Sequence, residues 1–177
     1  IFGIVIAIYG VKLFFLTPFS INHLLSRHII IEALESPEYL TSLGVLEQYG
    51  MRSHNGKFSN DSLEKDQKDL KKTKRLYKMI NSYDNDNLNK RDLSTKKIAL
   101  FQLENEIKER IKYPYHSYPL RQMNGAHTQI IEFMTDIHPI KDAKDGEYFI
   151  SRLNKISVKF NQILEKMEIR KELKIFP

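Results

Sequence analysis

The sequence predicts an all-α protein, built as a bundle-like array of about six to seven helices. Apolar residues recur three or four positions apart in several segments, and clusters of Pro, Gly, Asn and Ser separate those segments. No alternating strand pattern of useful length occurs. Hydrophobic residues make up 41% and charged residues 28% of the 177 positions, a balance typical of a chain that folds.

The first two helices are bounded by proline and glycine. Residues 22–35 carry apolar side chains at helical spacing and are followed by Ser36 and Pro37. Because serine caps helices and proline is tolerated in a first turn, Ser36 predicts the start of a second, short helix that stops at Gly44. Residues 50–62 are rich in Asn, Ser, Asp and Gly and predict a loop.

Residues 63–80 predict a charged helix with one narrow apolar stripe. Leu70, Tyr77 and Ile80 form that stripe. The same segment carries a basic cluster with no acid between its members, made of Lys71, Lys72, Lys74, Arg75 and Lys78. The net charge of +6 would suit a phosphate backbone, but aromatic interleaving and a binding motif are missing. The cluster is therefore interpreted as a solvated face, and nucleic acid is not expected as a partner.

The next helix is predicted to begin at Ser94 or Thr95, after a loop over residues 81–93, and to end at Pro114. Its apolar stripe consists of Leu100, Leu103, Ile107 and Ile111.

The last third of the chain predicts three more helices. One contains residues 130–137 and ends before Pro139, and a final pair spans about 142–155 and 157–173. The expected core stripe of the last helix is Phe160, Ile163, Leu164 and Met167.

Residues 1–16 are apolar apart from Lys12. Membrane spans need roughly 20 residues and signal-peptide cores roughly 7–15. Residues 1–17 are therefore predicted to be a signal or anchor segment, uncleaved because no small-x-small site follows, with a cleaved peptide and a buried core helix as alternatives. Residues 18–177 are interpreted as the N-terminal helical part of a larger domain, truncated at its C-terminus, because the chain starts with Ile1 and stops abruptly.

A search for catalytic chemistry finds no recognisable signature. Cysteine is absent, which excludes thiolate metal sites and a cysteine nucleophile. His116, His127 and His138 are evenly spaced, but proline and glycine between them break any common helix, so no metal site and no cofactor are predicted in this chain. Neither a His-Glu-x-x-His helix nor a Gly-x-Ser-x-Gly elbow occurs.

The segment Tyr113–Gly125 combines tyrosines, prolines, a histidine and an arginine between two helices. Loops often carry function, and polar aromatic side chains suit a binding surface. The same residues would also pack a helix corner, with Gly125 giving the backbone freedom to start the next helix. Both interpretations stay open from the residues alone.

Several short segments, taken in order, resemble the N-terminal part of the bacterial domain-of-unknown-function family 885 (DUF885). They are Pro18–Asn22, Leu40–Gly44, His116–Gly125, His138–Ile140, Asp142–Asp145, Tyr148, Arg152, Leu153, Phe160, Gln162 and Arg170. The resemblance covers nearly the whole chain. Near the C-terminus the family pattern has a glycine where this chain has Lys174.

The resemblance implies a large helical protein related to zinc-dependent peptidases, located in the bacterial cell envelope as a membrane-anchored or secreted protein. Its implied zinc site lies in a downstream His-Glu segment, so no residue here inherits a ligand or catalytic role. On this hypothesis the missing C-terminal half is a partner, residues 1–17 contact the membrane, and Tyr113–Gly125 lines a cleft for a peptide. The expected substrate contacts are His116, Tyr118, Arg121 and Gln122, with Arg121 suited to a carboxylate. The alternative is a non-catalytic, membrane-anchored helical binding module.

Overall fold

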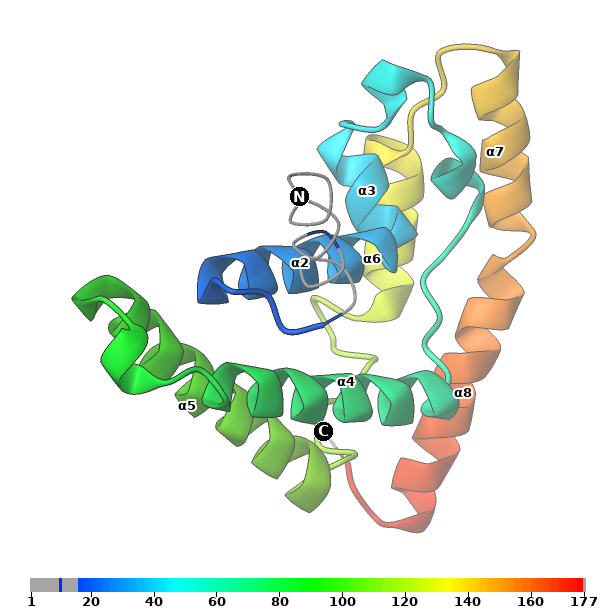
Figure 1. The fold of residues 1–177 in the computed structure, drawn as a ribbon. Coiled ribbons are helices and arrows are strands. Elements are labelled where there is room, and N and C mark those ends of the chain that lie inside the picture. The colour runs from blue at the N-terminus through cyan, green and yellow to red at the C-terminus, as the bar shows by residue number, and fades with distance from the viewer. Residues whose placement is uncertain (1–9, 11–15, 177) are drawn as a thin grey trace. The chain divides into compact units, whose positions relative to one another are not determined.

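The computed structural model describes residues 10 and 16–176, and that part of the chain contains helices and turns but no strand (Figure 1). The all-α prediction is confirmed for this part. The α-helices are α2 (Ile21–Leu34), α3 (Pro37–Leu43), α4 (Leu63–Asn81), α5 (Lys90–Lys112), α6 (Ala126–Glu132), α7 (Ala143–Leu153) and α8 (Ile156–Glu172). Shorter turns are η1 (Glu47–Tyr49), η2 (Ser53–Gly56), η3 (Asn85–Asn87) and the π-helical turn η4 (Phe133–Ile137).

The chain forms two compact units. Residues 1–32 and 67–113 belong to the first unit, and residues 33–66 and 114–177 belong to the second.

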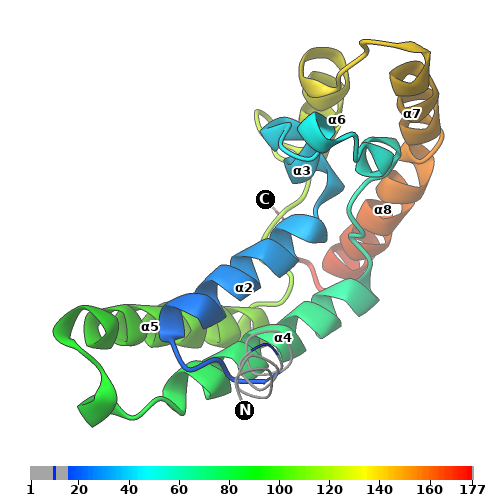
Figure 2. The same cartoon turned by 45° about the horizontal axis from the view of Figure 1, so that its top comes forward.

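The first unit is held together by one apolar core. Ile21 and Leu24 of α2 meet Leu76 and Ile80 of α4, and Leu103 of α5 completes the cluster. Figure 2 shows these three helices in a second view. Ile21 and Ile80 are fully buried in this core. The apolar stripes of α2 and α4 are therefore the faces that the two helices bury against each other.

Helix α5 begins earlier than Ser94 or Thr95. The side chain of Asn89 accepts a hydrogen bond from the backbone N–H of Asp92 at 2.9 Å and so caps the helix. The hydroxyls of Ser94 and Thr95 donate instead to carbonyls one turn back, as such residues do inside a helix. Lys96 is buried, and its ammonium donates a hydrogen bond to the carbonyl of Tyr83 at 2.5 Å. This bond compensates in part for the loss of water around the charge.

The second unit joins short elements to two long helices. Gly44 ends α3 in the left-handed region, at φ +60°, as the sequence predicted for that position. The carboxylate of Asp142 caps α7 by accepting from the backbone N–H of Asp145 at 2.9 Å. Turn η2 packs against α7, and a Cβ on Gly56 would lie 3.2 Å from the ring of Tyr148. The predicted loop at residues 50–62 therefore contains a buried turn.

Two predicted core residues are largely exposed. Ile111 of α5 and Leu164 of α8 are 57% and 49% exposed. In α8 the buried residues are Ile163 and Arg170, and in α7 they include Arg152, because guanidinium groups occupy the inner face of these helices. Apolar spacing marked the correct helices but not every inward-facing position.

The predicted anchor at residues 1–17 lies almost entirely outside the described residues. Within the described residues, no helix combines the length and the apolar character needed to cross a membrane.

Candidate functional site

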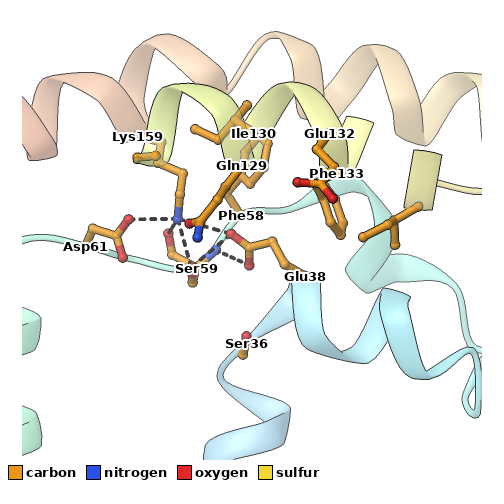
Figure 3. A pocket seen from close by; sticks show the side chains of 12 residues that line it. Ser36, Glu38, Phe58, Ser59, Asp61, Gln129, Ile130, Glu132, Phe133 and Lys159 are labelled. Atoms are coloured by element: carbon orange, nitrogen blue, oxygen red, sulfur yellow. Dashed lines mark hydrogen bonds and ion pairs between the residues drawn. The ribbon is translucent and has the colours of Figure 1, made fainter. Parts of the chain in front are cut away.

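A groove of about 490 Å³ opens on the surface of the second unit. Helices α3, α6 and α8, turn η4 and the extended segment around Ser59 surround it, as Figure 3 shows. Its lining residues are Ser36, Glu38, Phe58, Ser59, Asp61, Ala126, Gln129, Ile130, Glu132, Phe133, Ile137 and Lys159. The groove thus combines an apolar floor with a charged wall.

The charged wall is organised around the ammonium of Lys159. Its Nζ lies 2.7 Å from a carboxylate oxygen of Asp61 and 3.1 Å from Oε1 of Glu38. The same nitrogen donates to the hydroxyl oxygen of Ser59 at 2.9 Å. These contacts fix one wall of the groove, because they join α3, the segment at residues 59–61 and α8 (Figure 3).

Glu38 is ionised within this wall. Burial acts to raise the pKa of its carboxyl group, but the charge of Lys159 and the hydrogen bonds from the backbone outweigh burial and hold the pKa below its usual value. One of those bonds comes from the N–H of Ser59, at 2.9 Å. The wall therefore carries its negative charge at neutral pH.

The apolar floor is formed by Phe58 and by residues of α6 and η4. Ile130, Phe133 and Met134 are buried together, and Phe58 packs against them. The rings of Phe58 and Phe133 are tilted, with centroids 6.5 Å apart. A π-helical turn at Phe133–Ile137 adds one residue to the helical turn, a feature often found at functional sites.

Behind the floor lies a fully buried arginine, Arg152. Its guanidinium donates to the carbonyls of Lys57 at 2.8 Å and His54 at 2.9 Å, and to the hydroxyl of Thr41 at 3.1 Å. The guanidinium carbon lies 4.8 Å from the centroid of the Phe133 ring. Burial lowers the pKa of Arg152 to about 10, so the group stays charged at neutral pH.

Arg152 also fixes the protonation state of His138. Its Nη1 lies 2.8 Å from Nδ1 of His138, and because a guanidinium can only donate, Nδ1 accepts and the ring proton is on Nε2. Burial, followed by the charge of Arg152, lowers the pKa of His138. The imidazole is therefore neutral in the folded protein.

This geometry predicts a loss of stability in acid. The unfolded histidine takes up its proton near pH 6.5, before the folded one does, so the contribution of His138 is complete above about pH 6.5 and is lost as pH falls below it. Urea unfolding between pH 7.5 and 5 measures this loss. The His138→Gln variant should show a flatter pH dependence than the parent chain, whereas the variant of exposed His127, His127→Gln, should follow the parent. Parallel curves for the parent and His138→Gln would contradict the assignment.

The four substrate contacts expected from the sequence do not line the groove. His116, Arg121 and Gln122 are exposed and Tyr118 is half-buried, in the segment between α5 and α6. Their role stays a prediction. Gly125 ends this segment where space is tight, because a Cβ there would lie 2.7 Å from the carbonyl oxygen of Arg121.

The Tyr113–Gly125 segment is anchored by Arg170 of α8. The guanidinium of Arg170 donates to the carbonyl of Tyr115 at 2.8 Å and to that of Ser117 at 2.5 Å. It also lies 5.7 and 5.8 Å from the ring centroids of Tyr115 and Tyr118. Burial lowers the pKa of Arg170. Of the two interpretations of this segment, the packing of a helix corner is therefore seen in the structure.

The residues of the charged wall were not identified as a site from the sequence. The sequence placed Glu38 in the first turn of a predicted helix, and it placed Ser59 and Asp61 in a predicted loop. Lys159 follows Glu38 by more than a hundred positions, so no spacing links them. Gln162 and Arg152 appeared among the resemblance segments, and both lie close to this region, since Gln162 accepts from the N–H of Asp61 at 2.9 Å.

The described residues do not fit a zinc ion. Among the residues searched, no group of three or more His, Asp or Glu side chains is arranged so that it could hold a metal.

A family model with the description "Bacterial protein of unknown function (DUF885)" matches residues 37–177. The matched residues include all lining residues of the groove except Ser36. The comparisons with curated proteins and with solved structures gave no match.

Proposed function

The chain belongs to the family of bacterial proteins of unknown function DUF885, and we propose that its second unit binds a peptide segment in the groove as the substrate-binding part of a larger peptidase-like protein. The observation that carries this proposal is the composition of the groove. Phe58, Ile130 and Phe133 supply apolar contact area, and Glu38 and Lys159 hold a polar wall in fixed geometry. Ligand sites typically combine an apolar lining with a few placed polar groups, in volumes of roughly 300–1,000 Å³.

The peptidase part of the proposal rests on the resemblance described from the sequence. It assigns the zinc site and the catalytic residues to a segment downstream of residue 177, which would act as the partner of these helices. The described chain then supplies binding and not catalysis. The proposed location is the bacterial cell envelope, with the apolar run at residues 1–17 as signal or anchor. Nucleic acid has no place in this function.

A second candidate is a helical interaction module without any catalytic role. It is favoured by three consecutive isoleucines of α2, Ile29, Ile30 and Ile31, which are 64%, 58% and 41% exposed. Exposed apolar patches commonly mark protein–protein contacts. If the chain stays monomeric in size-exclusion chromatography over a hundredfold range of concentration, self-association through these isoleucines is excluded.

Peptide binding can be tested by NMR titration of the ¹⁵N-labelled 177-residue chain with capped, uncharged and charged tripeptides. The amides of Ser59, Asp61 and Ile130 should shift on addition of a bound peptide. The variant Ile137→Ala, which removes part of the floor, should weaken binding about three- to tenfold by loss of apolar contact. A matched control is Ile131→Ala, because Ile131 is exposed and does not line the groove. Equal effects of the two variants, or no shifts with any peptide, would overturn the proposal.

A further inference from the structure

The ammonium of Lys159 is saturated by the protein itself. An ammonium has three protons, and Nζ of Lys159 has three close acceptors, on Asp61 at 2.7 Å, Ser59 at 2.9 Å and Glu38 at 3.1 Å. Its side chain is only 11% exposed. A ligand carboxylate would have to break one of these contacts to reach it. Lys159 is therefore part of the framework of the wall and is not a receptor for an anion.

The charge left over in the groove is negative. Three carboxylates, those of Glu38, Asp61 and Glu132, line the groove, and among its described lining residues Lys159 carries the positive charge. The buried guanidinium of Arg152 behind the floor also acts on Glu38, so the three carboxylates face two cations and one negative charge remains. Glu132 comes from α6, on the side of the groove opposite Glu38 and Ser59 (Figure 3). A ligand entering between them meets carboxylates from two elements. Like charges would repel an acidic group there, and a cation would be attracted.

We infer that the groove selects peptides by a cationic group, a lysine or arginine side chain, placed between the wall at Asp61 and the carboxylate of Glu132. The apolar floor at Phe58, Ile130 and Phe133 then contacts the aliphatic part of the same side chain, since long basic side chains bury their methylene groups on apolar surfaces. This inference rests on the proposed function and specifies its substrate class.

The test compares three capped tripeptides that differ only in their central residue: acetyl-Ala-Lys-Ala-amide, its Gln counterpart and its Glu counterpart. Pairs of exposed charges contribute modestly, so the Lys peptide should bind about two- to fivefold more tightly than the Gln peptide, and the Glu peptide should bind most weakly. Amide shifts of the 177-residue chain give the three dissociation constants. At about 0.5 M salt the preference should decrease, because salt screens exposed charges.

A matched pair of variants assigns the preference to the groove. Glu132→Gln should reduce the Lys-over-Gln preference about two- to threefold. Glu168→Gln, which removes an exposed carboxylate outside the groove, should leave the preference unchanged. Equal binding of the Lys and Gln peptides, or tighter binding of the Glu peptide, would overturn the inference while leaving peptide binding intact. No binding of any of the three would overturn both.

Discussion

Replacement of Arg152 by alanine is expected to lower the free energy of unfolding by about 4 kcal/mol. The guanidinium is fully buried and donates to acceptors on three separate segments, at His54, Lys57, Thr41 and His138. Its removal takes a donor from each of these acceptors, of which the His54 carbonyl keeps the backbone N–H of Lys57, and it opens space behind the Phe133 ring. Unfolding in urea, followed by circular dichroism, measures the change.

Two further variants separate the role of the planar guanidinium from that of the charge. Arg152→Lys keeps a cation but loses the fork that reaches several acceptors at once, so it should recover less than half of the lost stability. Arg91→Ala removes an exposed arginine of α5 and should change stability by less than about 0.5 kcal/mol. A loss below about 1 kcal/mol for Arg152→Ala would show that the buried network is not a main source of stability.

Replacement of Arg170 by alanine is expected to cost about 3 kcal/mol and to loosen the Tyr113–Gly125 segment. Arg170 is 4% exposed and supplies donors to the carbonyls of Tyr115 and Ser117. Arg170 thus ties two backbone carbonyls of this segment to α8. Hydrogen exchange measured by mass spectrometry should become faster in a peptide containing residues 115–118.

The neighbouring residue provides the control for this variant. Lys171 is exposed, so Lys171→Ala should leave both the unfolding free energy and the exchange rates unchanged. If Arg170→Ala reduces stability but leaves exchange in the segment unchanged, Arg170 supports α8 and does not anchor the segment.

The sequence predicts the limits of a helix well where a single residue can end or begin it. The limits of α3 at Pro37 and Gly44 were predicted correctly, because proline and a left-handed glycine constrain the backbone locally. The side chain of Ser36, however, makes no capping hydrogen bond. The start of α5 was misplaced because residues 87–95 contain five side chains of cap-forming types, on Asn87, Asn89, Asp92, Ser94 and Thr95. Asn89 accepts a hydrogen bond from the N–H of Asp92, and contacts from outside this stretch, from Asn22 to Asp92 and from Lys96 to the carbonyl of Tyr83, accompany that earlier start.

The groove was not predictable for a different reason. Glu38, Ser59 and Lys159 come from segments far apart in the chain, and each reads alone as an ordinary polar residue. Arg152 and Arg170 were recognised only as family markers, because burial of an arginine depends on acceptors supplied by other segments. The Tyr113–Gly125 segment could be identified from the sequence because its tyrosines and prolines lie next to one another in the chain.

The central claim is that peptides bind between α3, α6 and α8 of the second unit. Its most direct test is an isotope-filtered NOE experiment on the 177-residue chain with the bound Lys tripeptide. We expect NOEs from the lysine methylene protons to the methyl groups of Ile130 and Ile137, which line the groove. NOEs to Leu120 of the Tyr113–Gly125 segment, with none to Ile130 or Ile137, would contradict it and would favour the aromatic segment as the binding surface.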